Sequence, residues 1–128
     1  MMELRVYYED TDAGGVVYHA NYIKYMARGR TEFLRERGLS QDLRARGYAF
    51  PVVRLEIDYL SPAFHDDLLE VETVVLEIGK TSITFRQRVS RPMDGKLLTD
   101  GKVTVVCSGM NGELKRLPPE LLKALRTL

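Results

Sequence analysis

The stretch from Tyr7 to Tyr22 reads YYEDTDAGGVVYHANY, and the rest of the chain is organised around it. Alternating apolar residues before and at its start predict a strand over residues 3–9. A helical pattern begins directly after it. Between the two, the run from Asp10 to Gly15 interrupts regular structure, because adjacent glycines permit positive φ angles. The order is therefore strand, acidic glycine-containing loop, helix.

Length and composition indicate one cytoplasmic domain spanning residues 1–128. The 19 Lys and Arg residues against 18 Asp and Glu leave a formal net charge of +1, which gives no support for a nucleic-acid or membrane-surface protein. A single cysteine, Cys107, cannot form an internal disulfide and favours a reducing compartment. No apolar run has the length of a membrane span or a signal peptide, so we expect no membrane insertion.

Periodicity predicts the remaining elements. A 3.6-residue period indicates one long helix over residues 21–37, with Tyr22, Ile23, Met26 and Ala27 on its apolar face. Two shorter helices are expected, one starting at Ser40 and one opened by Pro118–Pro119. Period-two alternation predicts four further strands over residues 53–59, 68–78, 83–89 and 103–107.

This order predicts an α+β fold. The turns between the later strands are short, which implies antiparallel neighbours. The simplest two-layer arrangement places the long helix across one face of the sheet. Both faces of the strand around Val74, Val75 and Leu76 are apolar, so we expect association with another copy of the chain.

Several kinds of site do not fit the sequence. A G-x-S-x-G nucleophile elbow is absent, and Cys107 lies in an apolar strand pattern typical of a buried residue. Asp10 and Asp12 imitate the start of a calcium loop, but the later ligand positions carry the wrong residues. The two histidines, His19 and His65, are far apart in sequence, so we expect no metal site.

The run VYYEDTDAGGVVYHANY, residues 6–22, resembles the signature of hotdog-fold acyl-CoA thioesterases of the hydroxybenzoyl-CoA thioesterase class. It is most similar to the YbgC type, which is associated with the Tol-Pal envelope system. The similarity continues through RTEFL at residues 30–34, through SPA and DDLLEV within residues 61–71, and through VVC at residues 105–107. The resemblance implies a five-stranded antiparallel sheet wrapped around one long central helix. It also implies a homodimer or homotetramer with active sites at the dimer interface.

The resemblance also implies roles for individual residues. Asp12 matches the catalytic carboxylate, acting as a nucleophile or as a general base. The backbone amide of His19 would polarise the thioester carbonyl, and Tyr8 matches a tyrosine ahead of the acidic loop. Coenzyme A would be part of the substrate, so no separate cofactor is expected. From the residues alone, Asp12 is more typical of a turn residue, and Tyr8 is at least as typical of the core.

Seven further residues are expected at the substrate: Gly14, Gly15, Val16, Tyr18, Asn21, Thr81 and Ser82. The glycines fit a close approach of the thioester, while Asn21 could instead cap the helix. Thr81 and Ser82 match residues that related enzymes bring from the partner subunit, and they could equally be a polar strand start.

The resulting prediction is an acyl-CoA thioesterase acting on a short-chain or aromatic acyl group, with a possible link to the Tol-Pal system or to acyl carrier protein. Two alternatives remain at the level of sequence. One is a non-enzymatic module that binds acyl-CoA or acyl carrier protein on the same fold. The other is a dehydratase or hydratase, whose loop pattern differs from the one around Asp12.

Overall fold

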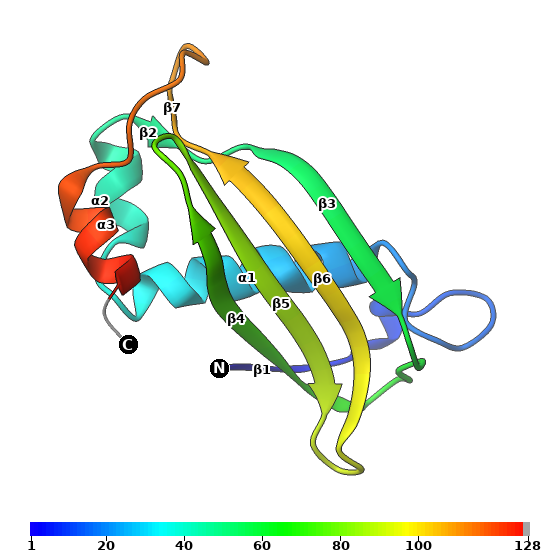
Figure 1. Ribbon diagram of the computed structural model, residues 1–128. Coiled ribbons are helices and arrows are strands. Elements are labelled where there is room, and N and C mark those ends of the chain that lie inside the picture. Colours follow the sequence, from blue (N-terminus) through cyan, green and yellow to red (C-terminus); the bar gives the residue numbers. More distant parts are fainter. Residues whose placement is uncertain (127–128) are drawn as a thin grey trace.

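A five-stranded antiparallel sheet forms the body of the computed structural model, which describes residues 1–126 without the side chains of residues 40–42. The strands lie in the order β1-β4-β5-β6-β3, so β1 and β3 are its edges (Figure 1). Their bounds are β1 Met2–Arg5, β3 Val52–Tyr59, β4 Leu68–Ile78, β5 Ser82–Arg91 and β6 Lys96–Val106. This confirms the predicted five-stranded antiparallel α+β architecture.

The helices are α1 (Asn21–Arg35), α2 (Ser40–Ala45) and α3 (Pro119–Arg126). α1 has 15 residues, which corresponds to a length of about 22 Å, and α2 and α3 have 6 and 8 residues. A second sheet pairs β2 (Tyr48–Ala49) with β7 (Ser108–Gly109). None of the helices within residues 1–126 is long and apolar enough to cross a membrane.

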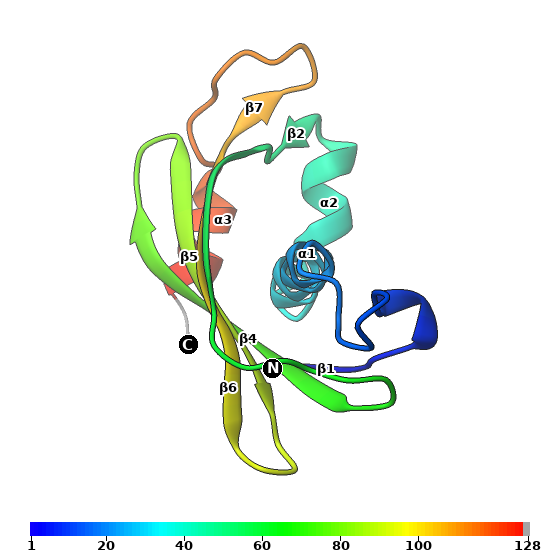
Figure 2. The same ribbon diagram turned by 90° about the vertical axis from the view of Figure 1, so that its right-hand side faces the viewer.

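α1 lies in the hollow of the curved sheet, as the end-on view in Figure 2 shows. Two glycines permit this approach. A Cβ on Gly29 of α1 would lie 2.8 Å from the side chain of Val71, and one on Gly101 of β6 would lie 2.7 Å from Met26. Between them, the fully buried Gln87 donates a hydrogen bond of 2.8 Å to the carbonyl oxygen of Met26. Helix and sheet therefore meet with backbone close to backbone.

The face of α1 that meets the sheet differs in part from the predicted one. Tyr22 and Met26 are buried as expected, but Ile23 and Ala27 are exposed. Tyr25 and Gly29 are buried in their place. The difference arises because the helix is rotated so that its smallest residue contacts the sheet.

Two predicted strands have clearly different bounds in the structure, whereas β3 and β5 differ from their predicted bounds by only one or two residues at an end. The strand expected over residues 3–9 ends at Arg5, because the Asp10 carboxylate accepts a hydrogen bond from the Tyr7 N–H and closes a 3₁₀ turn, Tyr8–Asp10. Tyr8 is consequently 80% exposed and is not a core residue. The strand expected over residues 103–107 begins earlier, at Lys96, and ends at Val106.

Candidate active site

The loop between the 3₁₀ turn and α1 is a narrow hairpin that protrudes beyond the end of β3 (Figure 1). Thr11 and Val17 form an antiparallel bridge, and the Asp12 N–H donates to the carbonyl oxygen of Val16 at 2.9 Å. Val16 also bridges to Phe64, which ties the hairpin to the segment before β4. The hairpin therefore has a defined backbone even though its tip is exposed.

Asp10 holds the base of this hairpin. One carboxylate oxygen accepts the Tyr7 N–H at 2.8 Å, and the other accepts the Asn21 side-chain amide at 2.9 Å. The Asp10 carbonyl oxygen accepts the Tyr18 N–H at 2.9 Å. Asn21 therefore bonds across the loop, and the residue before α1, Ala20, makes no side-chain cap.

The Tyr25 side chain lies buried next to this network. Burial raises its pKa first, and the charge of Asp10 raises it further, so the phenol remains protonated at neutral pH. Its hydroxyl makes no hydrogen bond of good geometry among the described residues, although it lies near the Asp10 carboxylate. Tyr25 is therefore a neutral phenol beside the Asp10 carboxylate and does not act as a phenolate at neutral pH.

Asp12 stands at the turn of the hairpin with its side chain exposed. Oδ1 of Asp12 accepts the Gly14 N–H at 2.8 Å, and the Asp12 carbonyl oxygen accepts the Gly15 N–H at 3.0 Å. A Cβ on Gly14 would lie 3.2 Å from that same Oδ1, and Gly15 has a φ of +82°. The two glycines thus let the chain fold back tightly around the carboxylate, and Oδ2 is left without a partner within residues 1–126.

His19 lies in the turn that precedes α1. Its carbonyl oxygen accepts a hydrogen bond of 2.8 Å from the hydroxyl of Tyr59, at the end of β3. Its ring lies 4.5 Å from that of Tyr18 and 6.3 Å from that of Tyr59, between centroids. The N–H groups of His19 and Ala20 have no acceptor in the part of the chain that the structure describes. Two backbone donors are therefore available before the helix, as expected at a helix N-terminus.

Other predicted residues lie elsewhere. Tyr8 is on the outside of the hairpin base, with its ring centroid 6.0 Å from that of His65 in an edge-to-face arrangement. Thr81 and Ser82 lie at the opposite end of the sheet, because β5 runs from Ser82 over ten residues, or about 33 Å, toward the hairpin end. Within one chain the structure does not bring Thr81 and Ser82 to Asp12.

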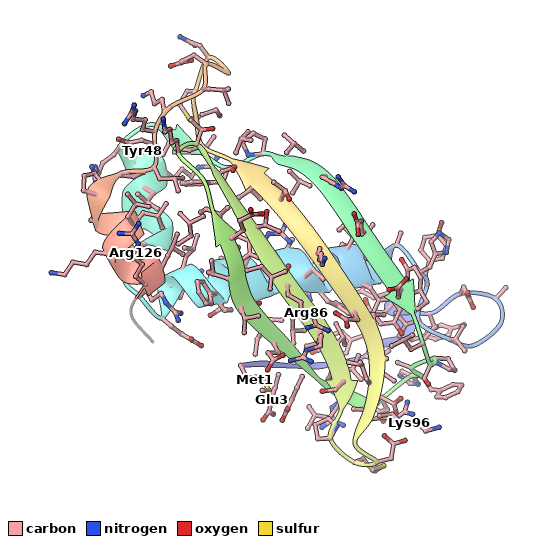
Figure 3. The ribbon with its side chains drawn as sticks, in the orientation of Figure 1. Met1, Glu3, Tyr48, Arg86, Lys96 and Arg126 are labelled. Atoms are coloured by element: carbon pink, nitrogen blue, oxygen red, sulfur yellow. The ribbon has the colours of Figure 1, made fainter. Side chains whose placement is uncertain are left out.

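Arg86 and Arg88 are both paired with carboxylates across the outer face of the sheet. Arg86 donates to Asp100 at 2.7 Å, and Arg88 lies 2.6 Å from Glu72. Figure 3 shows Arg86 midway along the sheet, far from either end. These arginines form part of a paired, solvated face.

Cys107 is buried, and burial raises the pKa of its thiol, so it remains a protonated small apolar residue at neutral pH. Among the residues that the structure describes, no group of three or more His, Cys, Asp or Glu side chains is placed to hold a metal ion.

Comparisons with known proteins agree with the architecture. The model of the Thioesterase-like superfamily matches residues 6–125. The acyl-CoA thioester hydrolase YbgC of Escherichia coli O6:H1 is 44% identical over 123 residues, which cover 95% of this chain and 89% of that protein. The acyl-CoA thioesterase YbgC of Haemophilus influenzae is 45% identical over 124 residues, which cover 94% of this chain and 89% of that protein. A crystal structure of a 1,4-dihydroxy-2-naphthoyl-CoA thioesterase from Synechocystis superposes with a TM-score of 0.89 at 25% identity, covering 97% and 93% of the two chains.

The chain belongs to the thioesterase-like superfamily, whose hotdog-fold members its sheet and helices resemble. It is a hydrolase, and within the superfamily it is YbgC-like; the curated relatives support acyl-CoA thioesterase activity.

Proposed function

We propose that the chain hydrolyses a short-chain or aromatic acyl-CoA to the free acid and coenzyme A, with Asp12 as the reacting carboxylate. The observation that carries this proposal is the exposed Asp12 on a rigid hairpin that leads into two unpaired N–H groups before α1. A carboxylate and oriented N–H donors are the groups that acyl transfer requires. The donors are those of His19 and Ala20.

Two reaction courses use the same groups. In one, an Asp12 oxygen attacks the thioester carbonyl carbon, the C–S bond breaks, and water then hydrolyses the mixed anhydride. In the other, Asp12 takes a proton from water, and the resulting hydroxide attacks the carbonyl carbon before the C–S bond breaks. In both, the thiolate leaves and is protonated, and negative charge on the carbonyl oxygen is stabilised by the two N–H groups. Because a thioester is already reactive, we propose that no cofactor takes part beyond the coenzyme A of the substrate.

We propose that the acyl group contacts the aromatic cluster of Tyr18, His19 and Tyr59. Tyr18 and Tyr59 are each about half exposed, so they offer an unoccupied apolar surface beside the two N–H donors. Gly14, Gly15 and Val16 would lie along the thioester. Asn21 and Asp10 would hold this arrangement without touching the reacting atoms. Tyr8 remains a candidate for contact from the outer side of the hairpin.

We further propose that the active unit is a homodimer or homotetramer of one domain, residues 1–128, in the cytoplasm. β3 is an edge strand, and its flanks expose Val52, Val53, Tyr59 and Leu60. An exposed apolar edge of this kind is suited to pairing with another copy. α1 would then be the central helix of the hotdog arrangement in each copy, and Thr81 and Ser82 would reach the site from the partner. A physiological link to the Tol-Pal system or to acyl carrier protein belongs to the same proposal.

The decisive experiment measures free thiol release from short-chain, long-chain and aromatic acyl-CoAs. Wild type is compared with Asp12→Asn and with Glu9→Gln, which removes one exposed carboxylate charge nearby. We expect Asp12→Asn to lower kcat by at least a hundredfold while Glu9→Gln retains activity, with both variants folded by circular dichroism. Full activity in Asp12→Asn would show that Asp12 is a loop residue.

A binding module is the second candidate, and one observation favours it. Oδ1 of Asp12 accepts the Gly14 N–H, which is also how a purely structural turn residue behaves. If wild type binds acyl-CoA but cleaves no member of the panel, the binding-module proposal replaces the thioesterase proposal.

A further inference from the structure

A pocket of about 750 Å³ lies at the end of the sheet away from the Asp12 hairpin. Its walls come from the β4–β5 turn, from β2, and from the segment that leads into α3. Tyr48, Leu117 and Pro118 supply apolar surface, while Lys80, Arg116 and Arg126 supply three positive charges. Figure 3 labels Tyr48 and Arg126 at this end of the molecule and Lys96 at the other.

The charge of this pocket is unbalanced. No Asp or Glu is among the residues that line it, and within residues 1–126 none of Lys80, Arg116 and Arg126 forms an ion pair. This differs from the outer sheet face, where Arg86 and Arg88 each have a carboxylate partner. Cations gathered around apolar walls without acids are the chemistry of an anion site.

The backbone of the pocket is held firmly although its charged side chains are exposed. The Leu117 N–H donates to the Lys80 carbonyl oxygen at 3.0 Å, and the Cys107 N–H donates to the Thr81 carbonyl oxygen at 2.6 Å. The first bond joins the β4–β5 turn to the segment containing Arg116, and the second joins the same turn to the end of β6. Lys80 and Arg116 therefore project from two connected backbones, and little further ordering is needed to bind a shared anion.

An aromatic ring completes the pocket. The Tyr48 ring has the guanidinium of Arg46 5.6 Å from its centroid and the ammonium of Lys115 5.2 Å from it. Arg46 is paired with Glu120, whereas Lys115 adds its positive charge to the rim. A flat ring beside several cations suits a ligand that combines a base with phosphates.

We propose that this pocket binds the phosphate-bearing nucleotide end of a coenzyme A thioester whose acyl end reacts at the Asp12 hairpin of a second copy. The inference rests on the proposed function and extends it. The pocket and the hairpin of one chain are separated by the length of β5, so they serve different substrate molecules. Thr81 and Ser82 directly follow Lys80, which places the pocket beside the residues predicted to reach a partner's site.

Charge supports the same orientation. The hairpin end carries Glu9, Asp10, Asp12 and Asp66, whose charges would repel phosphates, while Asp67 there is paired with Arg91. The positive charges of the pocket end attract phosphates. A substrate with phosphates at one end and a neutral thioester at the other is therefore aligned by the electrostatic potentials of the two ends.

The binding test uses adenosine 3′,5′-bisphosphate as a probe, measured by calorimetry at fixed ionic strength. The double variant Lys80→Ala/Arg116→Ala is compared with wild type and with Lys96→Ala, an exposed cation at the far end. We expect the double variant to weaken binding by about ten- to a hundredfold and Lys96→Ala to leave it within about twofold. Equal binding to all three proteins, or no binding to wild type, overturns the proposal.

A kinetic test separates this inference from the proposed function. Hydrolysis of an acyl-CoA is compared with hydrolysis of the matching acyl-pantetheine, which lacks the nucleotide. We expect the double variant to raise KM for acyl-CoA by about tenfold or more and to leave kcat and the acyl-pantetheine reaction unchanged. If the double variant hydrolyses acyl-CoA and acyl-pantetheine with an equal loss of kcat/KM, the nucleotide assignment is wrong. It is also wrong if the variant loses activity only toward an acyl carrier protein substrate. If wild type binds the probe but cleaves neither substrate, the pocket stands and the thioesterase proposal fails.

Discussion

The peptide between His19 and Ala20 is fixed by a hydrogen bond from outside the loop. Its carbonyl oxygen accepts the Tyr59 hydroxyl at 2.8 Å, while its N–H has no acceptor within residues 1–126. A trans peptide is planar with C=O and N–H on opposite sides, so fixing the carbonyl also fixes the N–H direction. Tyr59 therefore aims the Ala20 N–H from 40 residues away in sequence.

Replacing Tyr59 by Phe removes this hydrogen bond and keeps the ring. We expect kcat to fall by about three- to tenfold with KM little changed, because the donor is aimed less well at the developing charge. The free energy of unfolding should decrease by about 1 kcal/mol. Steady-state kinetics and urea denaturation measure the two effects. Tyr7→Phe is the matched control, since the Tyr7 hydroxyl has no hydrogen bond among the described residues. An unchanged kcat in Tyr59→Phe would mean that this peptide takes no part.

The sequence alone predicted the loop that carries the candidate site, but it did not predict which residues of other elements contact that loop. The spacing of Asp10, Asp12 and the glycines predicted an acidic loop before the helix, because turn chemistry is local. The bond from Tyr59 to the His19 carbonyl joins separate elements, so no local pattern contains it. Thr81 and Ser82 lie at the far end of β5 from the hairpin, and in the proposed dimer a second copy would have to bring them to Asp12, which no local pattern in one chain encodes.

At the scale of elements, the contact between α1 and the sheet depends on two glycines, Gly29 and Gly101, which have no side chain to hold the two apart. Gly29 would be a weak position in an isolated helix, since Ala is favoured there by about 1 kcal/mol. In the structure a Cβ at this position would meet Val71 at 2.8 Å and the Gln87 amide at 2.9 Å. Local propensity and packing therefore oppose each other, and packing has the larger magnitude.

Gly29→Ala should accordingly destabilise the protein by roughly 1–2 kcal/mol, the packing cost less the gain in helix propensity. The midpoint of urea denaturation measures the change. Arg28→Ala supplies the control, because Arg28 is the exposed neighbour on the same helix, where an alanine makes no contact with the sheet and helix propensity hardly changes. Stabilisation by Gly29→Ala would show that helix and sheet can separate to admit a methyl group.

The same contact explains which strand was predicted too short. Asp100 and Gly101 lie outside the strand predicted over residues 103–107, and glycine and aspartate are residue types that are depleted in strands. In the structure they lie in the middle of β6, where Gly101 leaves room for the Met26 side chain of α1. β4 was predicted correctly over residues 68–78, since its pattern serves the sheet alone. Hydrophobic periodicity fails to predict strand residues such as Gly101, whose type is set by a contact with another element.

At the scale of the whole molecule, opposite ends of one chain carry the two halves of the proposed site. The hairpin end holds Asp12 and the N–H donors, and the other end holds the basic pocket with Lys80 and Arg116. β3 offers an unpaired edge between them. A dimer through such an edge would turn two incomplete ends into complete sites.

Mixed oligomers test this arrangement directly. One chain carries Asp12→Asn with an intact pocket, and the other carries Lys80→Ala/Arg116→Ala with an intact Asp12. The two chains are co-expressed with different tags, and the mixed species is purified through both. If the halves of a site come from different copies, one of the two sites in the mixed dimer is intact, and kcat/KM for acyl-CoA should be about half that of wild type. If both halves came from the same chain, neither site would be intact, and kcat/KM would equal the mean of the two parent proteins. Activity no higher than that mean would therefore contradict a site shared between copies, and so would a monomeric active enzyme in size-exclusion chromatography.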